Sequence, residues 1–345
     1  MTTRAIQRKR LTLLSCIMYM LASCTSQEKK EQALEHRVDS ISVNTRGFVS
    51  LGGASQYVET FGSSKDLPLL LFIHGGPGWP QTPMLRHLNA DLGRHFIVAT
   101  WDQRGCGLSY MRDSAAKDVS LDRIVSDAHE LTRILQQKFK QKKIWLVGFS
   151  WGTIVGMELA KKYPEDYTAF VSISQVVNMS ASMRATQDWL RKEALSKNDA
   201  GTLSALKKIQ GANLSNFTRQ YELINSYGGA VFDSSTQAAV NRAMTTDADY
   251  RAYDWNKGYD YSSKALARDM FSTDYQDLNS LSIPVFFLSG RHDWNVPQVL
   301  TEKLFKRLRA PYKELVWFEK SGHGPLEEEP ARFVDVLGSL PSRIH

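Results

Sequence analysis

Cysteines and long apolar segments are scarce in this chain. Its 345 residues include three cysteines, Cys16, Cys24 and Cys106, which are too few for a framework of disulfide bonds. No run of 18 consecutive apolar residues occurs, so the sequence predicts no ordinary transmembrane helix. The composition, 42% hydrophobic and 23% charged, excludes a disordered chain and a collagen-like repeat.

A large excess of charge of one sign is also missing from most of the chain. The net charge is +7, and Arg4, Arg8, Lys9 and Arg10 supply four positive charges before position 24, where no acid occurs. The rest of the chain is close to neutral and has no stripe of arginines interleaved with aromatic residues. The sequence therefore predicts no nucleic-acid partner.

The N-terminus has the layout of an export signal. A basic segment at residues 4–10 precedes an apolar stretch at residues 11–22, which is too short to span a bilayer. The stretch runs into the sequence LASC, ending at Cys24, which resembles the lipobox of bacterial lipoprotein precursors. The resemblance implies that residues 1–23 are removed and that the Cys24 thiol is lipidated. An ordinary signal peptide or a short membrane anchor is the alternative.

This interpretation predicts a location as well as a domain organisation. The protein would be held by a lipid anchor outside the cytoplasm, in the cell envelope, as a periplasmic or outer-membrane lipoprotein. Residues 24–40 are polar and charged and suit a flexible tether between the membrane and a globular domain.

From residue 41 onward the pattern predicts an α/β sheet with helices on both faces. Continuous apolar runs bounded by glycine or proline are typical of strands buried on both faces of a mostly parallel sheet. Apolar residues recur at helical spacing between Leu121 and Leu135, with Ser120 as a plausible N-cap. This alternation of strands and helices is typical of α/β folds. The predicted strands are residues 69–73, 97–101, 144–147, 285–288 and 315–318.

The alternation stops between residues 177 and 270. This stretch is polar, is rich in helix-forming residues and has no comparable apolar run. We therefore expect a helical cap at residues 177–270, inserted into a core that is formed by residues 41–176 and 271–345. Such an insertion would act as a lid over the core and would not be an independent domain.

The strongest chemical signal is the sequence GFSWG at residues 148–152. This G-x-S-x-G motif follows a predicted strand and precedes a helical pattern, which is the setting of a nucleophile elbow. Glycines flank the turn because its backbone segments approach too closely for a Cβ atom. Ser150 is therefore the predicted nucleophile, placed at the carboxyl edge of the sheet and at the start of a helix.

The sequence HGGPG at residues 74–78 ends the first predicted strand. In folds with a nucleophile elbow, this loop gives one backbone N–H to an oxyanion hole, and the residue after the nucleophile gives another. Since Pro77 has no N–H, the predicted donors are Gly76 and Trp151. A plain flexible turn is the alternative. We expect His74 to hold the loop by a hydrogen bond and not to act as a base.

Three motifs in this order resemble those of the prolyl iminopeptidase family of α/β-hydrolases. They are HGGPG at residues 74–78, DQRGCGLS at 102–109 and GFSWG at 148–152. The resemblance extends over about residues 41–344 and implies an α/β-hydrolase fold and a serine aminopeptidase that favours N-terminal proline. Phe149 stands where the family has a glycine, which leaves the nucleophile intact but weakens the inference about substrate class.

The order of catalytic residues in this fold, serine, acid and histidine, predicts the rest of a triad. Asp293 follows the strand at residues 285–288 in a G-x-x-D-x-x-x-P spacing that matches the family. His323 follows the last predicted strand, and His292 is its only rival. We expect His323 to take the proton of Ser150 during attack and to deliver it to the leaving group, while Asp293 fixes the imidazole tautomer.

Other polar residues in these loops are predicted to be structural. Asp102 and Arg104 are expected to anchor their loop as ion partners, and Cys106 is a small residue without a base to activate it. No metal-ligand pattern, P-loop or dinucleotide fingerprint occurs in the sequence. We therefore expect neither a metal nor a cofactor.

An aminopeptidase must also bind the ammonium group of its substrate, which requires a carboxylate or an aromatic face. Residues 245–261 combine aspartates with aromatic side chains and suit such a subsite, and Glu222 is a further candidate. The alternative is a solvated pair of helices whose aromatic residues pack on the core. The residues are Asp247, Asp249, Asp254 and Asp260 among Tyr250, Tyr253, Trp255, Tyr259 and Tyr261.

The predicted reaction is acyl transfer to water through an acyl-Ser150 intermediate, with a small peptide or another small acyl compound as substrate. An esterase or amidase on the same fold is one alternative. A lipoprotein that binds ligands with an inactive site is another, which the intact Ser150, Asp293 and His323 disfavour. Epoxide hydrolases and haloalkane dehalogenases use aspartate at the nucleophile position, so Ser150 argues against both. The sequence does not define the oligomeric state.

Overall fold

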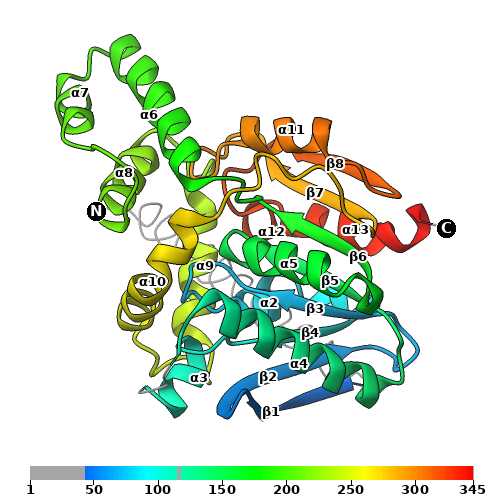
Figure 1. Cartoon of the computed structure of the whole chain (residues 1–345). Coiled ribbons are helices and arrows are strands. Elements are labelled where there is room, and N and C mark those ends of the chain that lie inside the picture. Colours follow the sequence, from blue (N-terminus) through cyan, green and yellow to red (C-terminus); the bar gives the residue numbers. More distant parts are fainter. Residues whose placement is uncertain (1–42, 115–117, 345) are drawn as a thin grey trace, which may run out of the picture. The chain divides into compact units, whose positions relative to one another are not determined.

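Eight strands in one sheet organise the residues that the structure describes, 43–114 and 118–344. The strands are β1 (Val43–Leu51), β2 (Ala54–Gly62), β3 (Leu69–Ile73), β4 (Ile97–Trp101), β5 (Ile144–Phe149), β6 (Tyr167–Ile173), β7 (Val285–Gly290) and β8 (Lys313–Phe318). In this computed structural model their order across the sheet is β1-β2-β4-β3-β5-β6-β7-β8 (Figure 1). The predicted leader, the tether and Cys24 lie outside the described residues.

The sheet is parallel except at one edge. Strands β3 to β8 pair in parallel, whereas β1 pairs antiparallel with β2, and β2 pairs antiparallel with β4. Each of the five strands predicted from apolar runs is present, and the predicted α/β fold is confirmed. Parallel strands need crossover connections, which are helices here and which cover both faces of the sheet.

The sequence analysis did not identify three of the strands. Strand β1 is an edge strand whose residues alternate between buried and exposed positions, so it has no continuous apolar run. Strand β2 also contains polar residues, among them the buried Gln56, Glu59 and Thr60. Strand β6 carries Thr168 and Ser172 among its apolar residues. Polar residues buried by tertiary contacts hide a strand from a search for apolar runs.

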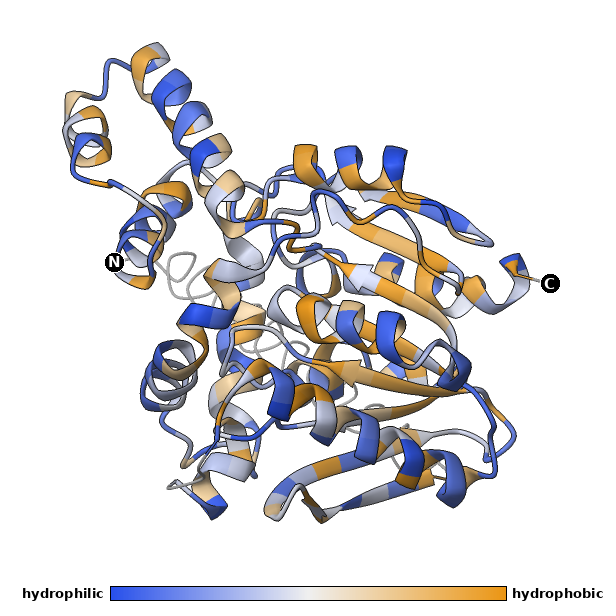
Figure 2. Cartoon of the chain, viewed as in Figure 1, coloured by the Kyte–Doolittle hydropathy of each residue, from blue (hydrophilic) through white to orange (hydrophobic). Residues whose placement is uncertain are grey.

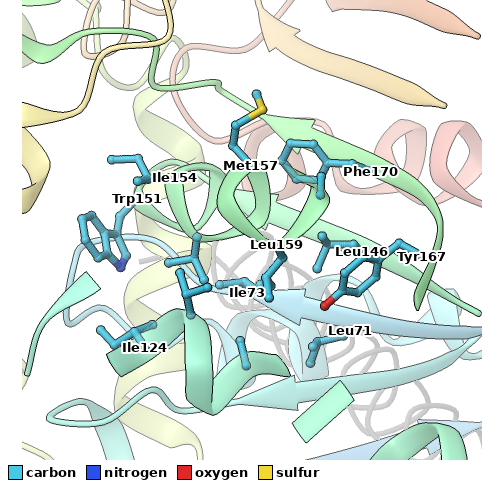
Figure 3. Packing of buried hydrophobic residues seen from close by; sticks show 14 of the residues in the cluster. Leu71, Ile73, Ile124, Leu146, Trp151, Ile154, Met157, Leu159, Tyr167 and Phe170 are labelled. Carbon is cyan, nitrogen blue, oxygen red and sulfur yellow. The ribbon is translucent and has the colours of Figure 1, made fainter. Parts of the chain in front are cut away.

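Helices α4 (Leu121–Phe139) and α5 (Trp151–Lys162) contribute much of the buried core. Ser120 is the N-cap of α4, as predicted, and its hydroxyl accepts a hydrogen bond from the Arg123 N–H at 3.3 Å. Trp151, Ile154, Met157 and Leu159 of α5 project among core residues such as Phe170 of β6 (Figure 3). The rigid packing of α5 on β5 and β6 fixes the start of α5, where Ser150 lies.

The remaining helices of the core are short. They are α2 (Thr82–Leu88), α3 (Gly107–Arg112), α11 (Gln298–Arg307), α12 (Pro325–Glu328) and α13 (Pro330–Ser339), with 3-10 turns at Ala90–Arg94, Pro164–Asp166 and Leu340–Arg343. The central strands are predominantly hydrophobic, whereas the helices around them mix hydrophobic and hydrophilic residues (Figure 2). This distribution is expected for amphipathic helices on a fully buried sheet.

A group of helices lies between β6 and β7 and beside the core (Figure 1). It consists of α6 (Met179–Ser196), α7 (Ala200–Lys207), α8 (Leu214–Ser226), α9 (Ser234–Thr246) and α10 (Trp255–Ser272). Met183, Leu190, Leu206 and Ile224 form a small apolar cluster of their own within it. We call helices α6–α10 the cap. None of the helices in the described part of the chain is long and apolar enough to cross a membrane.

Candidate active site

Ser150 lies in a sharp turn between β5 and α5. Its backbone has φ 51° and ψ −118°, a region that non-glycine residues seldom adopt. The Ser150 N–H donates to the Ile173 carbonyl at 2.9 Å, which ties the turn to β6. A Cβ at Gly148 would collide with the carbonyl of Gly152, and one at Gly152 would collide with the carbonyl of Ile73. Both glycines of the motif are therefore sterically required.

The structure brings Ser150, His323 and Asp293 together in one hydrogen-bonded line. The Nε2 atom of His323 lies 2.9 Å from Ser150 Oγ, and its Nδ1 atom lies 2.9 Å from Asp293 Oδ2. The other carboxylate oxygen of Asp293 accepts the Val296 N–H at 2.8 Å. The acid is thus fixed by the loop after β7, the histidine by the loop after β8 and the serine by the elbow. This geometry allows His323 to remove the Ser150 proton.

The surroundings of His323 favour its protonated form. Burial opposes a charge on the imidazole, but the charge and the hydrogen bond of Asp293 outweigh burial and raise the pKa of His323 above its usual range. The negative charges of Glu327 and Glu328 act in the same direction. A positive charge on the His323 imidazole is therefore stabilised at this position.

The loop that carries His323 is anchored on both sides. The His323 N–H donates to the Ala230 carbonyl at 2.8 Å, and the Ser174 hydroxyl donates to the His323 carbonyl at 2.8 Å. Glu328 accepts the Gly322 N–H at 2.8 Å. The rival, His292, is stacked on the ring of Phe232, with the two ring centroids 4.1 Å apart.

The loop after β3 is packed against the elbow. Gly75, Gly76 and Trp151 line the same cavity as Ser150. Gly76 has φ 106°, and a side chain there would meet the backbone of Gly78. The Trp151 N–H belongs to the first turn of α5, where backbone donors have no partner within the helix. Both predicted oxyanion donors therefore border the space in front of the nucleophile.

His74 holds this loop, as expected from the sequence. Its Nδ1 atom lies 2.9 Å from the Gly75 carbonyl, and its Nε2 atom accepts the Gln103 N–H at 3.1 Å. Burial lowers the pKa of His74 to about 4, so the ring is neutral near pH 7. A neutral ring with Nδ1 as donor and Nε2 as acceptor satisfies both hydrogen bonds.

A cavity of about 410 Å³ opens in front of Ser150 and His323. The loops of the core form its floor, and α8, α9 and α10 of the cap contribute side chains to its wall. This volume suits one amino-acid residue or another small acyl group together with part of a leaving group. The apolar part of the wall includes Trp79, Phe149, Met179, Phe217, Val240 and Tyr259.

Residues 68–330 of the chain match the family described as alpha/beta hydrolase fold. The match includes the elbow, the loop after β3, the cap, and the loops of Asp293 and His323. The chain belongs to the α/β-hydrolase family. The α/β-hydrolase fold predicted from the motifs is therefore confirmed, with the cap inserted after β6.

Relatives and solved structures also resemble this hydrolase. The probable aminopeptidase YbaC of Bacillus subtilis is 30% identical over 298 residues, which cover 84% of this chain and 93% of YbaC. The proline iminopeptidase of Neisseria gonorrhoeae is 28% identical, covering 72% of this chain and 81% of its own. The structure of proline iminopeptidase from Mycobacterium smegmatis superposes with a TM-score of 0.61 at 18% identity, covering 87% and 98% of the two chains. The resemblance to prolyl iminopeptidases is therefore confirmed.

The aspartates suggested for an ammonium subsite in this hydrolase have other partners. Asp247 and Asp249 both pair with Arg86, at 2.9 and 2.8 Å. Asp254 accepts the Lys257 N–H at the start of α10, and Asp260 pairs with Lys264 on the exposed side of that helix.

The cavity wall, as far as the structure describes it, takes Asn256 and Tyr259 from this segment. It includes neither Glu222 nor any of the four aspartates. The structure therefore gives no support to a subsite formed by these acids. The segment instead ties the cap to the core through Asp247 and Asp249. Its aromatic residues Tyr250, Tyr253 and Trp255 pack against one another.

The sequence analysis missed two glutamates that do line the cavity. Glu327 and Glu328 lie in α12, four and five residues after His323. Burial raises the pKa of Glu327 to about 7 and also raises the pKa of Glu328. The run of three glutamates at residues 327–329 was the available signal, but a charge run alone is usually a solvated surface.

Asp102 and Arg104 anchor their loop, but through different partners. Arg104 pairs with Asp127, with Nε and Oδ2 2.9 Å apart. Asp102 accepts hydrogen bonds from the Tyr250 hydroxyl at 2.7 Å and from the Leu108 N–H at 2.8 Å. The expectation of an ion pair is therefore confirmed for Arg104, whereas Asp102 anchors its loop by hydrogen bonds. Asp102 binds the cap through Tyr250.

Residues that could hold a metal do not gather anywhere in the described ranges. No group of three or more histidine, cysteine, aspartate or glutamate side chains is placed to bind one. Cys106 is a buried free thiol, and burial raises its pKa well above the usual value. It is therefore a poor nucleophile.

Proposed function

We propose that this protein is a serine hydrolase in which Ser150 attacks the carbonyl carbon of a small substrate. The observation that carries this proposal is the position of His323, 2.9 Å from Ser150 Oγ on one side and 2.9 Å from Asp293 on the other. His323 takes the hydroxyl proton as Oγ bonds to the carbonyl carbon. The charge on the carbonyl oxygen is then stabilised by the N–H groups of Gly76 and Trp151.

The second half of the reaction reverses these roles. Protonated His323 gives its proton to the leaving amine or alcohol, and the acyl group stays on Ser150. A water molecule then gives a proton to His323 as its oxygen attacks the acyl carbon. His323 passes this proton to Ser150 Oγ as the bond to the acyl group breaks, which releases the acid and restores the serine hydroxyl. The raised pKa of His323 suits a group that must hold a proton between the two halves.

The proposed substrate is a peptide from which the N-terminal residue is released, with proline favoured. This proposal is supported by the relatives named aminopeptidase and proline iminopeptidase. The cavity of about 410 Å³ in front of Ser150 also has room for a proline residue. A ring such as that of proline would be in contact with the apolar side chains of the wall.

A comparison of two arylamides tests this substrate class. The full chain is assayed with a prolyl-arylamide and with its N-acetylated form, and kcat/KM is measured for each. Removal of the ammonium charge should lower kcat/KM at least tenfold, which corresponds to about 1.4 kcal/mol of transition-state binding. Equal values for the two compounds would contradict an aminopeptidase.

An esterase or amidase of small acyl compounds is the second candidate. It is favoured by the apolar part of the cavity wall and by Phe149, whose ring lies 5.3 Å from that of His323 where the prolyl iminopeptidase family has a glycine. Faster hydrolysis of a short-chain arylester than of every aminoacyl-arylamide would assign the protein to this class.

We also propose that the hydrolase is a lipoprotein of the cell envelope. The support comes from the sequence alone, namely the basic and apolar segments that lead into LASC at residues 21–24. A lipid on Cys24 would hold the domain at a membrane through the polar residues 25–40.

A further inference from the structure

We propose that Glu327, held by Gln81, binds the protonated amine of the substrate, so that the cation is recognised by the core of the fold and not by acids of the cap. This inference deepens the proposed aminopeptidase function and rests on it for the identity of the substrate. The cation site itself can be tested without that function, because it is assigned to a defined part of the cavity wall.

Glu327 is a partly buried carboxylate at the cavity wall. Its side chain lines the cavity, and its Oε1 atom accepts a hydrogen bond from Gln81 Nε2 at 2.5 Å. Within the described ranges, none of the ion pairs involves Glu327. A carboxylate removed from water without a counter-charge is unfavourable, and burial accordingly raises its pKa. A cationic ligand would supply the missing charge.

Gln81 holds this carboxylate in position. It is 1% exposed, and its Nε2 atom donates to Glu327 Oε1. Its own Oε1 atom is buried and shielded from the cavity, so the acceptor that a ligand can reach is the carboxylate of Glu327.

The ligand chemistry follows from the carboxylate. A protonated amine offers only N–H donors and a positive charge. It therefore matches a carboxylate at the cavity wall that forms no ion pair in the described part of the chain.

The position of Glu327 also fits the reaction. The amine of an N-terminal residue is two bonds from the carbonyl carbon that Ser150 attacks, so its subsite must adjoin the triad. Glu327 lies four residues after His323, and the charges of the two side chains shift each other's pKa. The aspartates of the cap pair with Arg86 or Lys264 and do not line the cavity.

Glu328, although adjacent, already has donors for its carboxylate. Its Oε1 accepts the Gly322 N–H and its Oε2 accepts the Phe232 N–H, at 2.8 and 2.7 Å. These hydrogen bonds hold the His323 loop to the segment before α9. Glu327 is therefore the carboxylate left to meet a ligand.

The test measures how strongly the enzyme prefers a cationic substrate. For the full chain, Glu327→Gln and Asp260→Asn, kcat/KM is determined for prolyl-arylamide and for its N-acetylated form. The ratio of the two values should fall at least tenfold in Glu327→Gln. Asp260→Asn removes the same charge from an exposed pair with Lys264 and should keep the ratio within twofold. An unchanged ratio in Glu327→Gln, or an equal fall in both variants, would overturn the proposal.

A second measurement uses only the unaltered protein, so it does not depend on the folding of a variant. Hydrolysis of a short arylester by the unaltered protein is inhibited with pyrrolidine, which is cationic at pH 8, and with tetrahydrofuran, its neutral isostere. Pyrrolidine should inhibit at a concentration at least tenfold lower, and equal potency would reject the cation site. If pyrrolidine is selective but no aminoacyl-arylamide is cleaved, the amine subsite stands and the aminopeptidase proposal fails.

Discussion

At the scale of single residues, the elbow combines an unusual backbone conformation with a reactive side chain. The left-handed φ of Ser150 points its hydroxyl away from the strand and toward His323. Backbone strain of this kind persists only where neighbouring contacts enforce it. Here the contacts are the hydrogen bond to Ile173 and the close approach of Gly148 to Gly152.

Ser150→Ala is expected to abolish turnover and covalent labelling by a phosphonate probe. The side chain is small and only 9% exposed, so its truncation should leave the thermal unfolding curve nearly unchanged. His323→Ala should reduce kcat by several orders of magnitude in the same assay, because members of a triad act as a unit. Substantial activity in purified Ser150→Ala would refute the assignment of the nucleophile.

The raised pKa of Glu327 predicts a pH dependence for the preference for cationic substrates. Burial moves this pKa to about 7, and the groups that face the carboxyl are Gln81, His323 and Glu328. Below that pH the carboxyl is neutral and attracts a cation weakly, whereas above it the carboxylate is charged. The ratio of kcat/KM for prolyl-arylamide to that for its N-acetylated form should therefore rise as pH increases through about 7.

The ratio of the two kcat/KM values separates the titration of Glu327 from the titration of the triad. Protonation of His323 stops both reactions, so its effect is common to numerator and denominator. The ratio in Glu327→Gln should be independent of pH between 6 and 8. A slope that persists in this variant would show that another group causes the dependence.

At the scale of elements, a buried ion cluster ties the cap to the core. Arg86 of α2 contacts Glu59 of β2, with Nε and Oε1 3.0 Å apart, and Asp247 at the end of α9 at 2.9 Å. Glu59 and Asp247 have side chains only 3% and 4% exposed. Although burial opposes ionisation of Asp247, hydrogen bonds and charge from His87 and Arg86 lower its pKa to about 2.

Arg86→Ala should therefore be strongly destabilising. It leaves the buried Glu59 with only the half-exposed Arg46 at 3.6 Å and the buried Asp247 with only His87 at 3.4 Å. Loss of one partner of a buried pair typically costs about 3–5 kcal/mol. Urea unfolding of the full chain at pH 7 measures the change in the free energy of unfolding. Lys264→Ala, which removes the cation of an exposed pair, is the control and should cost less than about 1 kcal/mol.

The cost of Arg86→Ala should also depend on pH. Because the pKa of Asp247 is lower in the folded protein than in the unfolded chain, its ion pair stabilises the fold above about pH 4. That contribution disappears as pH falls toward 2. The difference in unfolding free energy between Arg86→Ala and the unaltered protein should shrink on acidification, and a difference that grows would contradict this account.

At the scale of the whole molecule, the cap forms part of the cavity wall and is tied to the core. Helices α8, α9 and α10 contribute to the wall, while Arg86 and Tyr250 hold the cap to α2 and to the loop after β4. Under the proposed function, a cavity walled in this way would favour small substrates and short peptides over folded proteins.

The proposed anchor predicts where the hydrolase resides. Cys24→Ala should prevent lipidation and cleavage before position 24, because both reactions require the thiol of the lipobox. Expression of the full chain followed by membrane fractionation and intact mass measurement checks this outcome. A variant that is processed and fractionated like the unaltered protein would contradict the lipoprotein proposal.

The sequence by itself determined the features that depend on local pattern. Strands β3 and β4 follow from continuous apolar runs, because a strand buried on both faces needs no polar residue. The elbow follows from glycines that only a tight turn requires. The order Ser150, Asp293 and His323 follows from the strands that precede each residue. Each of these signals lies within a few neighbouring residues.

The tertiary structure alone decided which polar groups meet in the cavity. Glu327 and Gln81 are 246 residues apart, and Arg86 and Asp247 are 161 residues apart. Sequence analysis offered the aspartates of the cap as candidates for the amine subsite, but folding pairs two of them with Arg86. A carboxylate attracts a cationic ligand most strongly where it is desolvated and has no internal counter-charge. Both conditions depend on long-range packing, which no local spacing encodes.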